Sequence, residues 1–257
     1  MDNSSSFNLT IISTIIAMIS TILGALCIFF VKNNLNKKYY KMFLGFISGM
    51  MISSSIWSLL IPATKILENK FNNLVYISAG FLIGALSFKF IDKFILSIVM
   101  KNNFNVSSSL IRKSLIILSS SLRNLIEGIS IGIAFSLSNG SLAGALTLSS
   151  AMVLQNFPEG FSLSIPLKNA GLSKFKSFAI ASIPGIVEPI GGVLGIILSN
   201  KIALLMPIIL SFTAGSIITV VVDEIIPDYN NKRNSTHGTL GFTFGFILLL
   251  MLDILIK

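Results

Sequence analysis

The sequence predicts an all-α integral membrane protein that crosses the bilayer eight times. Of its 257 residues, 53% are hydrophobic and 11% are charged, and the mean hydropathy is +0.86. A chain of this composition is too apolar to be a soluble domain of this size. Its apolar windows are continuous and about 20 residues long, which is the length of a membrane helix. A membrane β-barrel would instead show short segments of alternating hydrophobicity.

Eight apolar windows follow one another, and no linker or shift in composition separates them, so the sequence predicts a single domain. The stretch at 92–113, between the third and fourth windows, is polar and basic and is predicted to be a loop. The windows cover about residues 9–31, 42–61, 74–91, 114–137, 141–166, 177–199, 202–222 and 238–256.

The basic residues are concentrated on alternate loops. One set of loops holds Lys32, Lys37, Lys38, Lys41, Lys93, Lys101, Arg112, Lys113, Lys168, Lys174, Lys176, Lys232 and Arg233. The other set, with both chain ends, holds Lys65, Lys70, Lys201 and Lys257. Because cytoplasmic loops of membrane proteins carry an excess of Lys and Arg, this asymmetry predicts a multi-pass protein of the cell membrane with both termini outside. The formal charge of +9 then reflects topology, and no nucleic-acid partner is expected.

The fifth window contains a polar stretch, Gln155–Gly160, with the sequence Q-N-F-P-E-G. A carboxylate within a membrane costs about 2.5–3.5 kcal/mol on insertion scales and marks a functional site. Gln155 and Glu159 are four residues apart and share one helix face, and Pro158 frees the carbonyl of Leu154. The stretch therefore predicts a cluster of oxygen ligands that suits a cation, although a polar patch that only joins helices is the alternative.

The fourth and fifth windows carry the same motif. Asn124–Ser130 and Asn156–Ser162 both match N-x-x-E-G-x-S, and the short loop between the two windows makes their helices antiparallel neighbours. Related motifs on oppositely directed helices are typical of transporters with inverted repeats, which bind their substrate near the membrane midplane.

Ionisable residues inside the windows are mostly acidic. Those well inside a window are Arg123, Glu127, Glu159 and Glu188, with Asp223 and Glu224 at the end of the seventh window. Such a negative balance favours a mobile cation. Carboxylate and amide oxygens suit hard divalent ions, and the residues that could supply them are Asn124, Glu127, Gln155, Asn156, Glu159 and Glu188. The single histidine, His237, is predicted to lie in the last loop, and no permanent cofactor is expected.

These features resemble the ZIP (Zrt/Irt-like) family of metal transporters, and above all its prokaryotic GufA-like and ZupT-like subgroup. The resemblance covers nearly the whole chain and rests on the paired motifs, on V-E-P-I-G-G and D-E-I-I-P, and on G-M-M-I-S-S-S-I-W-S-L-L-I-P in the second window. It implies a path between the second, fourth, fifth and seventh helices, with a two-metal site near the midplane. The implied partners are the lipid bilayer and a divalent ion such as zinc, iron, manganese or cadmium, carried as substrate; a homodimer is left open.

Carried over to this chain, the resemblance implies particular residues at the site. Its metal-site positions fall on Met51, Asn124, Glu127, Gln155, Asn156, Glu159 and Glu188, and its His-Glu pair on the exit side falls on Asp223 and Glu224. One position departs from the family, because Arg123 stands where a histidine usually begins the fourth-helix motif.

Arg123 cannot bind a metal, because its guanidinium stays protonated and has no lone pair to offer. It can pair with Glu127, four residues further on, or reach across to Glu159. We therefore expect Arg123 to act as a tethered cation in place of one of the two metals. The alternative is that Arg123 blocks the path and impairs transport.

Other classes of protein fit the sequence less well. An H-E-x-x-H metalloprotease motif and a G-x-G-D aspartyl motif are both missing, so no enzyme is expected, and no G-x-x-x-x-G-K-[ST] nucleotide-binding loop occurs. A proton- or sodium-coupled carrier of a non-metal solute, which would use the Glu-Arg network as its relay, stays an alternative.

Overall fold

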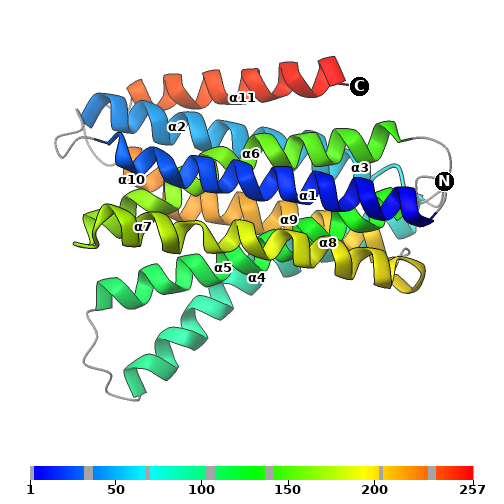
Figure 1. The fold of residues 1–257 in the computed structure, drawn as a ribbon, viewed down its shortest axis with the longest axis horizontal. Coiled ribbons are helices and arrows are strands. Elements are labelled where there is room, and N and C mark those ends of the chain that lie inside the picture. Colours follow the sequence, from blue (N-terminus) through cyan, green and yellow to red (C-terminus); the bar gives the residue numbers. More distant parts are fainter. Residues whose placement is uncertain are drawn as a thin grey trace.

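The computed structural model describes residues 3–31, 37–66, 70–101, 108–136, 142–202, 205–230 and 236–256, and in this part of the chain every regular element is a helix. The helices form eight rods, most of which run along one common direction, while α4 is inclined to it (Figure 1). The rods are α1 (Asn3–Leu26) with the 3₁₀ turn η1 (Cys27–Phe29); α2 (Lys37–Ser54) with the π-helix η2 (Ser55–Leu60) and α3 (Ile61–Ala63); α4 (Lys70–Lys101); α5 (Ser108–Ser136); α6 (Ala143–Asn169); α7 (Lys174–Ala181) with α8 (Ile183–Ile202); α9 (Met206–Val220) with the π-helix η4 (Val221–Ile225) and α10 (Ile226–Asn230); and α11 (Thr236–Ile256).

Five of the rods have the length and composition of membrane helices, and the described chain is helical throughout its regular elements, which confirms the predicted fold class. Within the described residues, five segments are long and apolar enough to cross a bilayer: Ser4–Phe29, Lys38–Ala63, Lys174–Ser199, Met206–Asp223 and Thr236–Leu255. Helices α4, α5 and α6 lie outside this set of five, and α5 and α6 carry most of the ionisable and amide side chains that fill the centre of the bundle.

The helices extend further than the apolar windows indicate. The stretch at 92–113 was predicted to be a loop, but α4 continues to Lys101 and α5 begins at Ser108, so this prediction is wrong for most of the stretch. A hydropathy window detects only the part of a helix that is apolar, whereas the backbone hydrogen bonds of a helix can continue beyond it. Likewise, α11 begins at Thr236, so His237 lies in its first turn.

Four pairs of helices pack so closely that the glycines of one helix lie against the backbone of the other. On Gly128 of α5 a Cβ atom would meet the carbonyl oxygen of Glu188, and on Gly191 of α8 it would meet that of Leu125. Such close approach is the usual role of glycine in packed membrane helices. The four pairs and their glycines are α1 with α6 (Gly24, Gly160), α5 with α8 (Gly128, Gly132, Gly191, Gly195), α2 with α11 (Gly45, Gly49, Gly241, Gly245), and α4 with α9 (Gly80, Gly84, Gly215).

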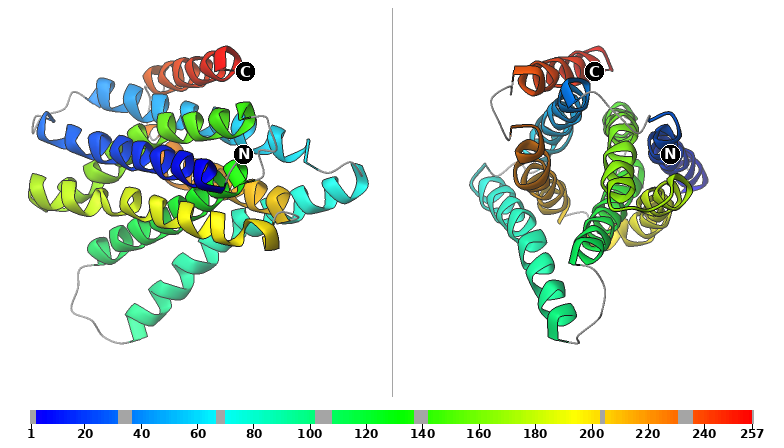
Figure 2. Two further views of the ribbon diagram at one scale, coloured as in Figure 1. Left: turned by 45° about the vertical axis from the view of Figure 1, so that its right-hand side comes forward. Right: turned by 90° about the vertical axis from the view of Figure 1, so that its left-hand side faces the viewer.

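These pairs assemble into two groups of helices. Helices α1, α5, α6, α7 and α8 pack mainly on one another, and so do α2, α4, α9, α10 and α11. The right-hand view of Figure 2 shows the two groups side by side, with α11, α2, α9 and α4 in one column and α6, α5, α1 and α8 in the other. We call them the first group and the second group, after α1 and α2.

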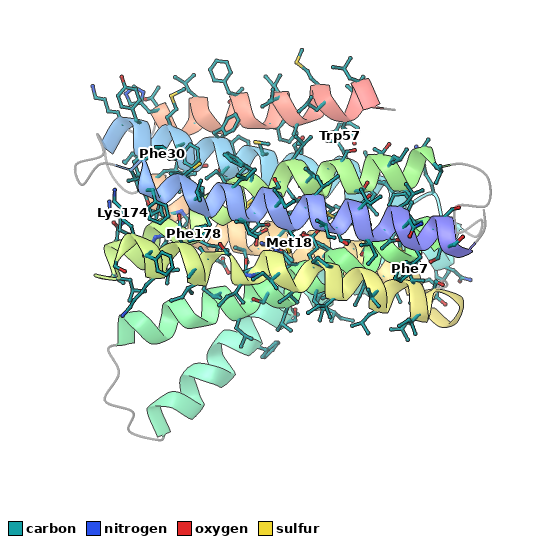
Figure 3. All side chains as sticks on the ribbon, in the orientation of Figure 1. Phe7, Met18, Phe30, Trp57, Lys174 and Phe178 are labelled. Atoms are coloured by element: carbon teal, nitrogen blue, oxygen red, sulfur yellow. The ribbon has the colours of Figure 1, made fainter. Side chains whose placement is uncertain are left out.

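Several described lysines lie at one end of the bundle. Helix α2 begins there, α6 ends there and α7 begins there (Figure 1), so this end carries Lys38, Lys41, Lys168, Lys174 and Lys176. The start of α1 and the end of α11 lie at the opposite end. Lys174 donates to the carbonyl of Phe29 at 2.9 Å, and the rings of Phe29 and Phe178 are 5.7 Å apart, which fastens α7 to the end of α1 near the labelled Phe30 (Figure 3).

The two π-helices stand at equivalent places in their rods. η2 is followed by Ile61 and Pro62, and η4 is followed by Ile226 and Pro227. Proline has no amide hydrogen, so each rod loses one intrahelical hydrogen bond at this point, and the backbone widens into a π turn in the residues before it. Such turns are frequent at functional sites, and both lie in the second group.

Candidate metal site

A cluster of polar side chains fills the centre of the first group. Asn124 and Glu127 come from α5, Asn156 from α6 and Glu188 from α8, and all four have 0% of their side-chain surface exposed. The close α5–α8 contact positions them, because Gly128 brings the backbone of Glu188 against α5 one residue after Glu127. The predicted residues of three separate helices are therefore together in one buried place.

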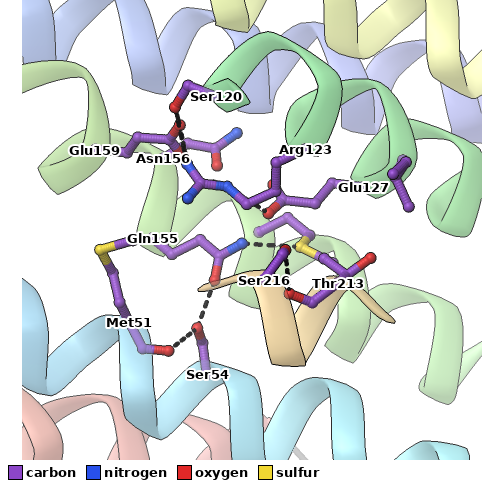
Figure 4. A network of polar contacts seen from close by, with 12 residues as sticks. Met51, Ser54, Ser120, Arg123, Glu127, Gln155, Asn156, Glu159, Thr213 and Ser216 are labelled. Atoms are coloured by element: carbon purple, nitrogen blue, oxygen red, sulfur yellow. Dashed lines mark hydrogen bonds and ion pairs between the residues drawn. The ribbon is translucent and has the colours of Figure 1, made fainter. Parts of the chain in front are cut away.

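Arg123 is paired within this cluster and is itself only 3% exposed. Its Nη2 atom forms an ion pair with Oε1 of Glu159, and its Nε atom lies 3.5 Å from Oε1 of Glu127 (Figure 4). Ser120 joins the pair, donating to Glu159 Oε1 at 2.5 Å and accepting from Arg123 Nη2 at 3.1 Å. Both partners proposed for Arg123 from the sequence are thus within its reach, with Glu159 as the closer one.

The carboxylate of Glu188 is only partly satisfied. Asn156 Nδ2 donates to Glu188 Oε2 at 2.6 Å, which orients the carboxylate toward α6. The other oxygen, Oε1, is buried and has no hydrogen-bond partner in the described residues. Since an unpaired buried carboxylate oxygen costs free energy, a further positive partner at this atom would be strongly stabilising.

The same is true of several neighbouring atoms. Within the part of the chain that the structure describes, Asn124 Oδ1, both carboxylate oxygens of Glu127 and Asn156 Oδ1 are buried without a hydrogen-bond donor. Native proteins leave few buried polar atoms in this state, and a bound cation would supply a further partner for these oxygens, of which Glu127 Oε1 already lies 3.5 Å from Arg123 Nε. Glu127, Glu188 and the two asparagines therefore supply a set of oxygen atoms that fits a hard divalent cation.

Gln155 and Met51 lie at the boundary between the two groups of helices. Ser54 of α2 donates to Gln155 Oε1 at 2.5 Å, and Gln155 Nε2 lies 3.1 Å from the sulfur of Met152. Met51 is one turn before Ser54 and is 4% exposed (Figure 4). Thr213 and Ser216 of α9 complete this boundary and are fully buried.

Of the predicted exit residues, Asp223 lies outside this buried cluster. Asp223 is in the π-helix η4 of the second group, and its side chain is exposed. The backbone of Glu224 belongs to the same turn, while its side chain is outside the described residues. In the described chain, no three side chains of the His, Cys, Asp and Glu types come together as a metal cluster, so a bound ion here would need amide oxygens as well as carboxylates.

One buried acid was not singled out from the sequence. Asp253 of α11 is 5% exposed and accepts from Ser58 of η2 at 3.4 Å. A small cavity between α6, η2 and α11 is lined by Ser58, Thr147, Ala151, Leu154, Leu249 and Asp253. The signal was present, because Asp253 is the single ionisable residue in the apolar window at 238–256, three residues before its end.

The fold and this cluster define a multi-pass membrane protein of helices built around a buried, oxygen-rich polar site. The model of the ZIP zinc transporter family matches residues 98–253, and the chain belongs to this family.

Three relatives illustrate the range of similarity. The chain is 26% identical to the zinc transporter GufA of Myxococcus xanthus over 249 residues, which cover 95% of this chain and 97% of GufA. It is 32% identical to zinc transporter ZIP11 of Xenopus tropicalis over 151 residues, which cover 57% of this chain and 45% of ZIP11. It is also 32% identical to zinc transporter ZIPB of Bordetella bronchiseptica over 139 residues, which cover 54% of this chain and 44% of ZIPB. The chain thus spans less than half of the length of ZIP11 and ZIPB.

Proposed function

We propose that the protein carries divalent metal cations across the cell membrane and binds one ion at a time in the cluster between α5, α6 and α8. The observation that carries this proposal is the group of buried oxygens of Asn124, Glu127, Asn156 and Glu188 that lack hydrogen-bond donors in the described residues. Relatives named as zinc transporters support the class of substrate. The metal is a transported substrate, and no permanent cofactor or enzymatic activity is proposed.

Formal charge supports a single ion. Glu127, Glu159 and Glu188 bring three negative charges into the buried cluster, and Arg123 brings one positive charge, so two negative charges are left for a cation to balance. Glu159 already holds the guanidinium, which leaves Glu127 and Glu188 as the main ligands, with the two asparagines beside them. Gln155 and Met51 contact the ion during its passage between the two groups, and Asp223 and Glu224 receive it on the exit side.

An oxygen-only site also favours harder ions. Zinc prefers imidazole and thiolate ligands, whereas manganese and magnesium prefer carboxylate and carbonyl oxygens. Arg123 stands where a histidine is usual in the family, so this site lacks that imidazole ligand. Relative to zinc, it should therefore accept manganese better than a histidine-containing site does. Zinc, iron, manganese and cadmium are the ions to compare.

Transport follows from movement of the two groups of helices against each other. Most of the ligands belong to the first group, while Met51, Ser54 and the η4 turn belong to the second. Alternating access by rocking of one group around a fixed site, with an inverted repeat of the fourth and fifth helices, is therefore our proposal for the mechanism. Without a nucleotide-binding motif, movement is downhill or coupled to another gradient.

The test of this proposal is metal uptake by the purified protein in liposomes, with manganese, iron, zinc, cobalt and cadmium, for the wild type, Glu159→Gln and Arg123→His. We expect uptake by the wild type and its loss in Glu159→Gln, because that change leaves Arg123 without its closest partner. Arg123→His adds an imidazole ligand and is expected to raise the bound metal from one to two ions per chain, measured by equilibrium dialysis.

Two other results would lead to a different functional assignment. If the wild type carries no metal and Arg123→His restores uptake, the ion pair of Arg123 with Glu159 blocks the path and the protein is a transport-impaired member of the family. If none of the three variants carries metal, a proton- or sodium-coupled carrier of a non-metal solute becomes the better candidate. Membership of a metal transporter family favours the metal substrate over this alternative.

The orientation in the membrane is a separate proposal. We place the lysine-rich end, with Lys174 and Lys176, in the cytoplasm and both termini outside. Cysteine-labelling of intact cells checks this: in a Cys27→Ser background, Lys65→Cys is expected to react with an impermeant maleimide and Lys176→Cys is expected to react only after permeabilisation. The reverse pattern would mean that the topology is inverted.

The single-domain organisation and the homodimer also stay predictions. The mass of the protein in nanodiscs measures whether it is a homodimer.

A further inference from the structure

Ser120 touches both members of the central ion pair. It lies in α5, one turn before Arg123, and is 6% exposed. Its hydroxyl donates to Glu159 Oε1 at 2.5 Å and accepts from Arg123 Nη2 at 3.1 Å (Figure 4). A serine hydroxyl has one donor and two acceptor lone pairs, so it can satisfy both partners at once.

Arg123 has a choice between two carboxylates. Glu159 faces it from α6, while Glu127 lies four residues further on in its own helix, 3.5 Å from its Nε atom. The bond to Ser120 fixes the terminal nitrogen Nη2 on the side of Glu159. Glu127, as a result, keeps carboxylate oxygens without a hydrogen-bond donor among the described residues.

We propose that Ser120 is a positioning residue that holds the guanidinium of Arg123 on Glu159 and so keeps Glu127 available to the transported cation. Without the hydroxyl, the guanidinium turns toward Glu127, since residues four apart on a helix are neighbours, and competes with the metal for that carboxylate. The transport consequence rests on the proposed function, whereas the arrangement of the ion pair can be tested in the absence of metal.

The transport experiment measures KM and the maximal rate of manganese uptake in liposomes. Ser120→Ala is expected to raise KM about tenfold, as for the loss of a hydrogen bond to a charged group, with the maximal rate within about twofold of the wild type. Ser120→Thr keeps the hydroxyl and is expected to restore KM. Ser121→Ala is the matched control, because the hydroxyl of Ser121 donates to the carbonyl of Ile117 in its own helix at 2.8 Å. An unchanged KM, or a raised KM that threonine does not restore, would overturn the proposal.

The second experiment uses metal-free protein in detergent and measures Tm. Ser120→Ala is expected to lower Tm by about 3 °C in the wild type and by less than about 1 °C in the Arg123→Gln/Glu159→Gln double variant, which removes the two charges together. Equal losses in both backgrounds would mean that Ser120 does not act through the pair. Because no metal is present, this result decides the role of Ser120 even if the wild type carries no metal, in which case the proposed function alone fails.

Discussion

Replacing Glu127 with glutamine is expected to abolish metal uptake. The carboxylate of Glu127 is fully buried, lacks a hydrogen-bond donor among the described residues, and supplies one of the two negative charges that Arg123 leaves unbalanced in the cluster. Leaving a buried charge without its partner costs about 3–5 kcal/mol, which corresponds to a loss of affinity of about 100-fold or more. The initial rate of manganese or zinc uptake in liposomes at low metal concentration measures this effect.

Ser130→Ala provides the control for this prediction. Ser130 lies one turn further along α5, is as buried as Glu127, and donates to the carbonyl of Ile126 at 2.9 Å within its own helix. We expect its uptake rate to stay near that of the wild type. If Glu127→Gln folds normally and transports at a rate within about threefold of the wild type, the cation does not depend on this carboxylate and the site has been placed wrongly.

Among the variants proposed here, Gly128→Ala, which adds a single methyl group, is expected to cause the largest loss of stability. In Gly128→Ala the new Cβ atom would overlap the carbonyl oxygen of Glu188, which is backbone and cannot turn away. Helices α5 and α8 would have to separate, and overpacking of this kind typically costs about 1–3 kcal/mol, occasionally more. Because the separation also moves Glu188 away from Asn156, we expect a lower Tm in detergent together with weaker metal binding.

Gly144→Ala is the matched control. Gly144 lies in the first turn of α6, where a Cβ atom would meet nothing within 4 Å. There, alanine gains helix propensity without crowding, so Tm is expected to stay the same or to rise slightly. Similar losses in the two variants would show that the effect comes from the change of residue type and not from the contact between helices.

The fold was accessible from the sequence because the membrane imposes a simple rule on composition. Each rod must bury its backbone hydrogen bonds and expose apolar side chains to lipid, so a long apolar window marks it directly. The rule fails where a helix leaves the hydrocarbon layer, and for this reason the ends of α4 and α5 at 92–113 were missed. The π turns at η2 and η4 were also not foreseen, because a proline predicts a lost hydrogen bond but not how the backbone rearranges around it.

The polar cluster was accessible in part. Carboxylates and amides in apolar windows stand out, so Glu127, Glu159 and Glu188 could be named. The spacing of Arg123 predicted a pair with Glu127, and Glu159 was the alternative partner. Serine is common in membrane helices and gives no comparable signal, so Ser120 and Ser54 emerged only from their contacts. The roles of all these residues in metal binding stay predictions until the variants are measured.

The repeated motif N-x-x-E-G-x-S now has a physical explanation. Its glutamate projects into the polar cluster, while the next residue lets a neighbouring helix approach: Gly128 lies against Glu188 of α8, and Gly160 lies against Thr21 of α1. The final serines return to their own helices, Ser130 to Ile126 and Ser162 to Glu159, at 2.9 and 2.8 Å. One short motif thus combines a charge with the close packing that buries it.

The glycine contacts have a consequence for how the protein is made. In none of the four closely packed pairs do the two partners follow each other along the chain. The earlier and later members of the pairs are α1 and α6, α5 and α8, α4 and α9, and α2 and α11. During synthesis, helices enter the membrane from the N-terminal end, so the first four rods must remain in the bilayer without their tight partners until α6 arrives. Each closely packed pair thus joins a rod from the first half of the chain to one from the second half. The packing of α2 is complete only after α11, the last rod, has been inserted.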